Sequence, residues 1–144
     1  MASQTAQDTT VEMLISGLVD AWNAHDIESM LTLLSPNYEG SDVCQATPQR
    51  GRDETRQVVE AYLQAFPDLR FTTQELIVQD NHAAVSWSAT GTQRGAVLHI
   101  PPTGKAVAVC GVSMFTVEEN RISRGRHIWD VAAMLRELGL LPEL

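Results

Sequence analysis

The sequence is poor in the residues that cross-link small proteins or hold metals. It contains two cysteines, Cys44 and Cys110, which are far apart and form no CxxC pair. Two such residues are too few for a disulfide framework or a zinc centre, so we interpret them as reduced thiols of a cytoplasmic protein. The four histidines show no spacing typical of metal ligands. We therefore expect no metal site.

Long apolar runs and clusters of basic residues are also missing. No stretch approaches the roughly 18 consecutive apolar residues that a membrane span requires. Eighteen acidic side chains against 10 basic ones give a net charge of -8. Binding to nucleic acid or to an anionic membrane surface depends on clustered Lys and Arg. The composition therefore argues against both partners and favours a small molecule or another protein.

The motifs of the common cofactor-dependent enzymes are absent as well. The chain has no GxGxxG, no Walker A sequence, no HExxH and no GxSxG. If this protein is an enzyme, we expect it to work without a cofactor.

The composition that remains is that of one globular domain. Hydrophobic residues make up 44% of the 144 residues, which excludes disorder, and the length fits a single domain. We predict a flexible polar leader at residues 1–8 and a domain at residues 9–144. The leader has no basic segment followed by an apolar one, so we expect no secretion signal.

Helices are predicted in the first half of the chain. Apolar residues recur at helical spacing over residues 11–22 and 27–34, and Pro36 is expected to end the second helix. Residues 37–51 are rich in Gly, Ser, Asp and Gln and are predicted to form a loop. A third helix is predicted over residues 55–66.

The pattern then changes from helical to alternating. Segments 69–79, 83–92, 107–117 and 122–129 predict strands, and a short helix is predicted over residues 131–138. Helices followed by hairpin-linked strands predict an α+β fold with the helices packed on one face of an antiparallel sheet. A strongly curved sheet of this kind leaves a conical pocket beneath the helices.

Short segments along the chain carry a family resemblance. They are Ala21–Asp26, Ala65–Leu69, Thr90–Gly95, Ile100–Gly104 and Arg126–Asp130, the last running into Met134–Gly139. In this order and spacing they resemble the SnoaL-like polyketide cyclase family of the NTF2-like cone-fold superfamily. The resemblance implies an α+β cone, a homodimer and a cofactor-independent tailoring enzyme of natural-product biosynthesis. Such an enzyme cyclises or isomerises a small apolar substrate.

The resemblance also implies a catalytic residue. Ring-closing members carry a carboxylate where this chain has Asp130, which implies that Asp130 is the general acid/base. The same residue directly precedes an apolar helical run, where Asp is a preferred N-cap. A capped carboxylate has a lowered pKa, whereas a carboxylate in an apolar pocket has a raised one. The histidines that accompany the carboxylate in the family are replaced here by Gln93 and Ser113, so a shape-driven ring closure stands beside the aldol-type mechanism.

Strand alternation predicts the remaining pocket residues. If Asp130 faces the pocket, Arg126 and Ile128 share its face and His127 points away. Arg126 is a candidate either for a substrate oxygen or for a salt bridge at the rim. Met114 and Trp129 are expected to point outward and to suit a dimer interface. The other residues expected to bind the substrate are Tyr38, Trp87, Gln93, Ser113 and Phe115.

Two other functions stay open at this point. A non-catalytic module that binds a small molecule or dimerises would have the same fold. A hydrolase that opens an epoxide would have it too, but that reaction usually needs more than one carboxylate in the pocket. The substitution Asp130→Asn would separate an enzyme from a binding module.

Overall fold

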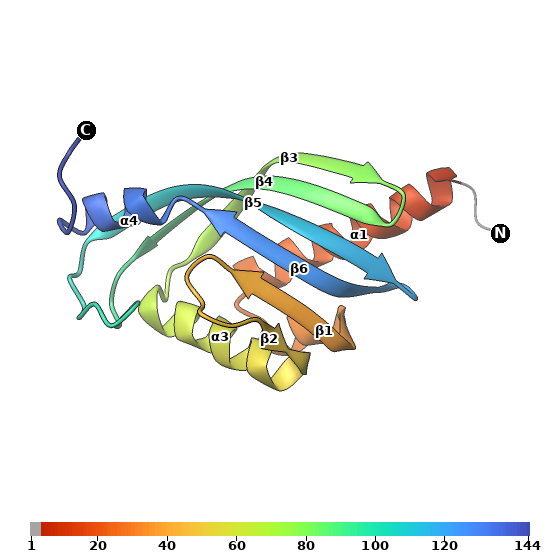
Figure 1. The fold of residues 1–144 in the computed structure, drawn as a ribbon, viewed down its shortest axis with the longest axis horizontal. Helices are drawn as coiled ribbons and strands as arrows, with labels where there is room; N and C mark the ends of the chain where they lie inside the picture. Colours follow the sequence, from red (N-terminus) through yellow and green to blue (C-terminus); the bar gives the residue numbers. More distant parts are fainter. Residues whose placement is uncertain (1–3) are drawn as a thin grey trace.

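The computed structural model describes residues 4–144, and Figure 1 shows their arrangement. The helices are α1 (Gln4–Asn23), α2 (Ile27–Thr32), α3 (Gly51–Ala65) and α4 (Val131–Glu137). The strands are β1 (Leu34–Asp42), β2 (Gln49–Arg50), β3 (Arg70–Gln79), β4 (His82–Thr92), β5 (Ala106–Glu118) and β6 (Arg121–Trp129). The α+β prediction is confirmed.

The six strands form one curved sheet in the order β2-β1-β6-β5-β4-β3. Strands β3 to β6 form an antiparallel meander, as the hairpin signals predicted, and β1 joins β6 in parallel. Helices α1 and α3 lie on the same side of this sheet (Figure 1). One face of the sheet is therefore covered and the other is open.

Two predictions about the first half of the chain are wrong. Residues 37–51, expected to form a loop, contain most of β1 and all of β2, and Pro36 lies inside β1 rather than ending a helix. Pairing with β6 and burial of Tyr38 in the core outweigh the turn-like composition of this segment. Helix α1 begins by Gln4, so residues 4–8 of the predicted leader are helical. Residues 1–3 of that predicted leader lie outside the described part of the chain.

The hydrophobic core lies between the helices and the covered face of the sheet. A larger cluster brings α1 and α2 onto the sheet, with Ile15, Met30 and Ile122 almost fully buried. A smaller cluster around Phe66 and Met134 packs the C-terminal helix beside the loop between β4 and β5. The two clusters fix the helices at both ends of the covered face.

The turn after α1 is tied to the edge strand β3 by side chains. The amide of Asn23 donates to the carbonyl oxygen of Phe71 at 2.9 Å and accepts from the Phe71 N–H at 2.7 Å. The ring of Trp22 packs edge-on against Phe71, with 5.3 Å between the ring centroids. His25 hydrogen-bonds through Nε2 to the Leu69 carbonyl oxygen at 2.8 Å. These contacts satisfy backbone groups that an edge strand would otherwise expose.

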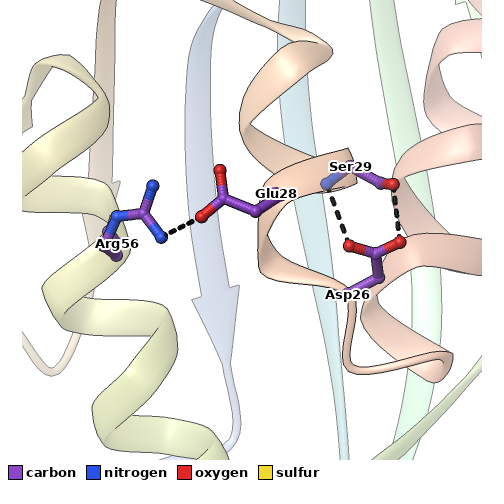
Figure 2. A network of polar contacts seen from close by, with 4 residues as sticks. All are labelled: Asp26, Glu28, Ser29 and Arg56. Atoms are coloured by element: carbon purple, nitrogen blue, oxygen red, sulfur yellow. Dashed lines mark hydrogen bonds and ion pairs between the residues drawn. The ribbon is translucent and has the colours of Figure 1, made fainter.

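Helix α2 is positioned by a cap and an ion pair, which Figure 2 shows. Asp26 accepts from the backbone N–H of Ser29 at 3.1 Å and from its hydroxyl at 2.6 Å, so it is the N-cap. These hydrogen bonds lower the pKa of Asp26. Glu28 pairs with Arg56 of α3, which links the two helices on the outside of the core.

We predict that Asn23→Ala destabilises the protein by about 1–3 kcal/mol, because it leaves the N–H and C=O of Phe71 without partners. Chemical denaturation monitored by circular dichroism would measure the change. Gln74→Ala, which removes an exposed amide from the same strand, is the matched control and should change stability by less than about 0.5 kcal/mol. Equal effects of the two substitutions would contradict the bridging role of Asn23.

Candidate functional site

A cavity of about 180 Å³ lies between the helices and the covered face of the sheet, and it is partly open to solvent. Its wall is mostly apolar and aromatic. All four helices and all six strands contribute to it. An engineered cavity of about 150 Å³ is large enough for benzene. The cavity therefore suits a small apolar molecule of about one ring.

Glycines on the inner face of the sheet make room for the large side chains of the wall. A Cβ atom at Gly125 would lie 2.2 Å from the hydroxyl oxygen of Tyr38. A Cβ atom at Gly111 would lie 2.6 Å from both the Trp87 ring and Cβ of Trp129. Both separations are far below van der Waals contact. The aromatic wall thus depends on the absence of side chains at these positions.

A chain of hydrogen bonds crosses the cavity wall from β4 to β6. The indole Nε1–H of Trp87 donates to Oγ of Ser113 at 3.0 Å. Oγ of Ser113 is in turn 2.8 Å from Nδ1 of His127. Ser113 and His127 are direct partners in the β5–β6 register, which places their side chains side by side on the inner face. The histidine is thereby held against the cavity.

Two polar atoms of the wall have no protein partner. Nε2 of His127 and the hydroxyl of Tyr38 make no hydrogen bond to any of residues 4–144. In this part of the chain no fully buried polar side-chain atom lacks a partner, so both atoms are accessible from the cavity that their residues line. Tyr38 lies beside Gly125, which is two residues before His127 on the same face of β6. These two groups are therefore available to a ligand from adjoining positions.

Asp42, at the end of β1, is a carboxylate whose hydrogen-bonding capacity is largely used. It accepts from the Tyr62 hydroxyl at 2.8 Å and from Nε1–H of Trp129 at 3.1 Å. It also accepts from the backbone N–H of Cys44 at 2.8 Å. Its register partner on β6 is His127. Asp42 therefore anchors α3 and the Trp129 ring at this end of the cavity.

Burial sets the protonation states of the site. It lowers the pKa of His127 below its ordinary value of 6.5, although the nearby Asp42 carboxylate opposes the shift, so the ring is neutral near pH 7. Burial raises the pKa of Tyr38. Burial, reinforced by the charge of Asp42 and its hydrogen bond, raises the pKa of Tyr62. Burial and the same carboxylate raise the pKa of the Cys44 thiol to about 12. The site thus presents neutral hydrogen-bonding groups around one carboxylate.

Four of the predicted pocket residues line the cavity and two face away from it. Tyr38, Trp87, Ser113 and Phe115 are in the wall. Arg126 and Ile128 are exposed on the opposite face of β6, so their predicted placement is wrong. His127 and Trp129, predicted to point outward, line the cavity instead.

The reversal follows from the premise of the prediction, which set the faces of β6 by placing Asp130 in the pocket, whereas Asp130 is the N-cap of α4. Val117 pairs with Ile122, but the preceding Thr116 pairs with Arg124, so Ser123 is an extra residue in β6. This bulge precedes Arg126, so the alternation from Arg126 to Trp129 is regular and only the assignment of its two faces was wrong.

Gln93 and Asp130 have structural contacts outside the cavity. Gln93 is fully buried and holds the loop between β4 and β5 through hydrogen bonds to Ile100, Pro101 and Thr103. It does not line the cavity, so its predicted placement there is wrong. Asp130 is exposed, accepts from the backbone N–H of Ala133 at 2.9 Å and is the N-cap of α4. Of its two interpretations, the cap is the one that these contacts support.

Sequence reasoning missed Asp42 and undervalued His127. Asp42 fell inside the predicted loop, and no local signal marked it as a strand residue. The alternation Gly125, His127, Trp129 was a signal for His127, since small and aromatic residues on one face suggest a packed wall. Among residues 4–144 no three His, Cys, Asp or Glu side chains gather closely enough to hold a metal ion. In the same part of the chain, no helix has both the length and the apolar character needed to cross a membrane.

The α+β cone and the apolar cavity under its helices define the fold class of the protein. A comparison of the sequence with family profiles identifies the family within that class. The profile of the SnoaL-like polyketide cyclase family matches residues 12–138. The chain belongs to this family, as the resemblance implied. A search of curated protein sequences found no match.

Solved structures share the whole fold. A putative SnoaL-like polyketide cyclase from Jannaschia sp. CCS1 superposes with a TM-score of 0.88 at 21% identity, over 99% of this chain and 100% of that one. AclR, a putative hydroxylase from Streptomyces galilaeus, superposes with a TM-score of 0.83 at 22% identity, over 99% of this chain and 86% of AclR. IdmH, a putative polyketide cyclase from Streptomyces antibioticus, superposes with a TM-score of 0.78 at 27% identity, over 90% of this chain and 98% of IdmH. The NTF2-like cone fold is thereby confirmed.

We predict that Gly125→Ala destabilises the protein by about 1–3 kcal/mol, because its Cβ would displace the hydroxyl of Tyr38. In a Tyr38→Phe background the loss should be smaller, with a coupling energy of about 0.5–3 kcal/mol between the two positions. Urea denaturation of the four proteins in this cycle measures it. Gly17→Ala in α1, where a new Cβ makes ordinary contact with Leu33 at 3.4 Å, should not destabilise. Additive effects of Gly125→Ala and Tyr38→Phe would show that the two residues do not share this space.

We predict a pH dependence of stability from His127. Because its pKa is lower in the folded than in the unfolded protein, the unfolded state binds more protons as the pH falls below 6.5. The free energy of unfolding should therefore decrease from pH 6.5 toward pH 4.5, with a slope of at most about 1.4 kcal/mol per pH unit. Below that window, protonation of carboxylates with a lowered pKa, such as Glu28, decreases the free energy of unfolding further. His127→Gln should flatten the curve between pH 6.5 and pH 4.5, and an unchanged curve would refute the assignment.

Proposed function

We propose that this protein catalyses a cofactor-independent ring closure or isomerisation of a small apolar ketone in the cavity. The observation that carries the proposal is an apolar cavity into which two neutral polar groups, the Tyr38 hydroxyl and the His127 ring, present atoms without protein partners. Membership of the SnoaL-like polyketide cyclase family supports the reaction class. Two proteins of similar structure, from Jannaschia sp. CCS1 and Streptomyces antibioticus, are putative polyketide cyclases and point the same way.

The chemistry requires little beyond shape and two hydrogen-bonding groups. A chain that carries a 1,3-dicarbonyl unit is partly enolised in water, so its nucleophilic carbon needs no strong base. The cavity would hold the enol carbon against a second carbonyl carbon, and such positioning can lower a barrier by several kcal/mol. As the carbon–carbon bond forms, the carbonyl oxygen becomes an alkoxide that Tyr38 and His127 stabilise. The alkoxide gains a proton and the enol oxygen loses one, so no cofactor is consumed.

Asp130 is not part of this proposal. Its carboxylate accepts a backbone N–H and faces solvent, where it cannot reach a molecule in the cavity. A catalytic role for Asp130 rests on the family resemblance alone. Among the described residues that line the cavity, Asp42 is the one carboxylate. This argues against epoxide opening, which usually uses more than one.

A homodimer stays a prediction. The open face of the sheet carries exposed apolar side chains on neighbouring strands, namely Val112 and Met114 on β5 and Ile128 on β6. Trp129, which was expected on this face, lies in the cavity wall, so Ile128 takes its place in the predicted interface.

We expect Tyr38→Phe and His127→Phe each to lower kcat by about 10²-fold, because each removes one donor to the developing oxyanion. Linear triketones with a terminal 1,3-diketone are suitable substrates, and product formation can be followed by chromatography with mass spectrometry. Asp130→Asn, which retains a capping side chain, should keep kcat within about twofold and stability nearly unchanged.

The opposite pattern would overturn the proposal. Loss of turnover in Asp130→Asn, with turnover retained in the Tyr38 and His127 variants, would return the acid/base role to Asp130. Binding of the triketones without product in any protein would instead indicate a non-catalytic binding module of the same fold.

A further inference from the structure

We infer that Trp87 and Ser113 fix the tautomer of His127, so that its Nε2–H is a permanent hydrogen-bond donor to a ligand carbonyl oxygen in the cavity. The inference rests on the proposed function for the location of the ligand, and it assigns a positioning role to Trp87 and Ser113. It also selects the ligand chemistry: a neutral apolar molecule that presents a hydrogen-bond acceptor at His127.

The argument begins with the direction of the first hydrogen bond. An indole Nε1–H can only donate, so Oγ of Ser113 must accept at the 3.0 Å contact with Trp87. The hydroxyl of Ser113 still has one proton to donate. Among residues 4–144 its other partner is Nδ1 of His127, at 2.8 Å. Donation to Nδ1 is therefore the arrangement in which the Trp87 N–H, the Ser113 O–H and Nδ1 of His127 all have a partner. The one donor left over, Nε2–H of His127, faces the cavity, which is partly open to solvent.

The alternative tautomer leaves a buried donor without a partner. If Nδ1 carried the proton, Ser113 would accept from both Trp87 and His127, and its own O–H would have no acceptor in the described part of the chain. Ser113 is 5% exposed, so water gives little compensation. An unsatisfied buried donor is costly. The proton of the neutral ring is thus placed on Nε2, the nitrogen that has no protein partner.

The surroundings of Trp87 keep this arrangement rigid. Its ring packs edge-on against Phe71, with 5.2 Å between the ring centroids, and Phe71 in turn packs against Trp22. The space that Trp87 needs in order to reach Ser113 is left by Gly111, whose Cβ would lie 2.6 Å from the indole ring. On the other side, the His127 ring packs edge-on against Phe115, with 5.6 Å between centroids.

A fixed Nε2–H changes the expected role of the histidine. A neutral imidazole with its proton on Nε2 cannot take a proton from the ligand through that atom, so His127 is a donor and not the general base. Such a donor stabilises a carbonyl oxygen or the oxyanion formed from it. Together with the Tyr38 hydroxyl, it gives the apolar cavity a preference for ketones over hydrocarbons of the same shape.

The first experiment reads the tautomer directly and needs no substrate. Long-range ¹H–¹⁵N correlation spectra near neutral pH identify which ring nitrogen carries the proton, and His127→Phe assigns the signals. We expect Nε2–H in roughly tenfold or greater excess in the wild type. Ser113→Ala and Trp87→Phe should shift the spectrum toward a mixture of tautomers. Ser86→Ala, which removes a hydroxyl from the opposite face of β4 next to Trp87, is the matched control and should leave the spectrum unchanged.

The second experiment tests the donor with a matched pair of probes, acetophenone and ethylbenzene, titrated by NMR. His127→Phe should weaken the binding of acetophenone by roughly 2–10-fold and leave the binding of ethylbenzene nearly unchanged. The inference would be overturned by any of three results. These are a proton on Nδ1, a tautomer ratio that does not change in Ser113→Ala and Trp87→Phe, or equal effects of His127→Phe on the binding of both probes. If neither probe binds while the proton is on Nε2, the proposed function fails and the positioning role of Trp87 and Ser113 stands.

Discussion

The wall of the cavity depends on a steric constraint: large side chains occupy the inner face of the sheet only because glycines lie beside them. Gly125 leaves the space that the Tyr38 hydroxyl fills, and Gly111 separates Trp87 from Trp129. Removing either gap would move an aromatic ring and with it a polar atom of the site. The glycines therefore act through packing, since neither has a left-handed backbone that would require glycine. Cavity shape and polar geometry are consequences of the same constraint.

Several polar residues in the segments by which the chain resembles its family hold the fold, whereas His127, in the last of these segments, faces the cavity. Asn23 and His25 bind the edge strand, Asp26 caps α2 and Asp130 caps α4. Gln93 holds the loop between β4 and β5. Short polar motifs at the ends of helices and strands satisfy backbone groups that any protein of this topology must satisfy. They therefore identify the family well and say little about which reaction a member performs.

The sequence allowed the fold class and the strands of the meander to be predicted, because their hydrophobic periodicity is local. It did not allow the inner face of β6 to be predicted. The predicted face depended on Asp130 pointing into the pocket, but Asp130 caps α4, and His127 and Trp129 lie on the inner face instead. Strand β1 was not predicted, because its pairing partner β6 lies more than 80 residues further along the chain. Tyr38 was placed in the cavity and the alternation around His127 was a usable signal, but Asp42 could be recognised only once β1 and β6 were aligned.

The chemistry of the site follows from how polar groups are buried in an apolar wall. A charged group would need partners of its own, and Asp42 shows this, since three donors surround its carboxylate. The groups left for a ligand are neutral, because burial raises the pKa of Tyr38 and lowers that of His127. Neutral donors in a small, poorly hydrated cavity bind a neutral acceptor without the desolvation cost of an ion pair. The same donors act more strongly on the negative charge that develops when that acceptor reacts, which is the condition for catalysis rather than binding alone.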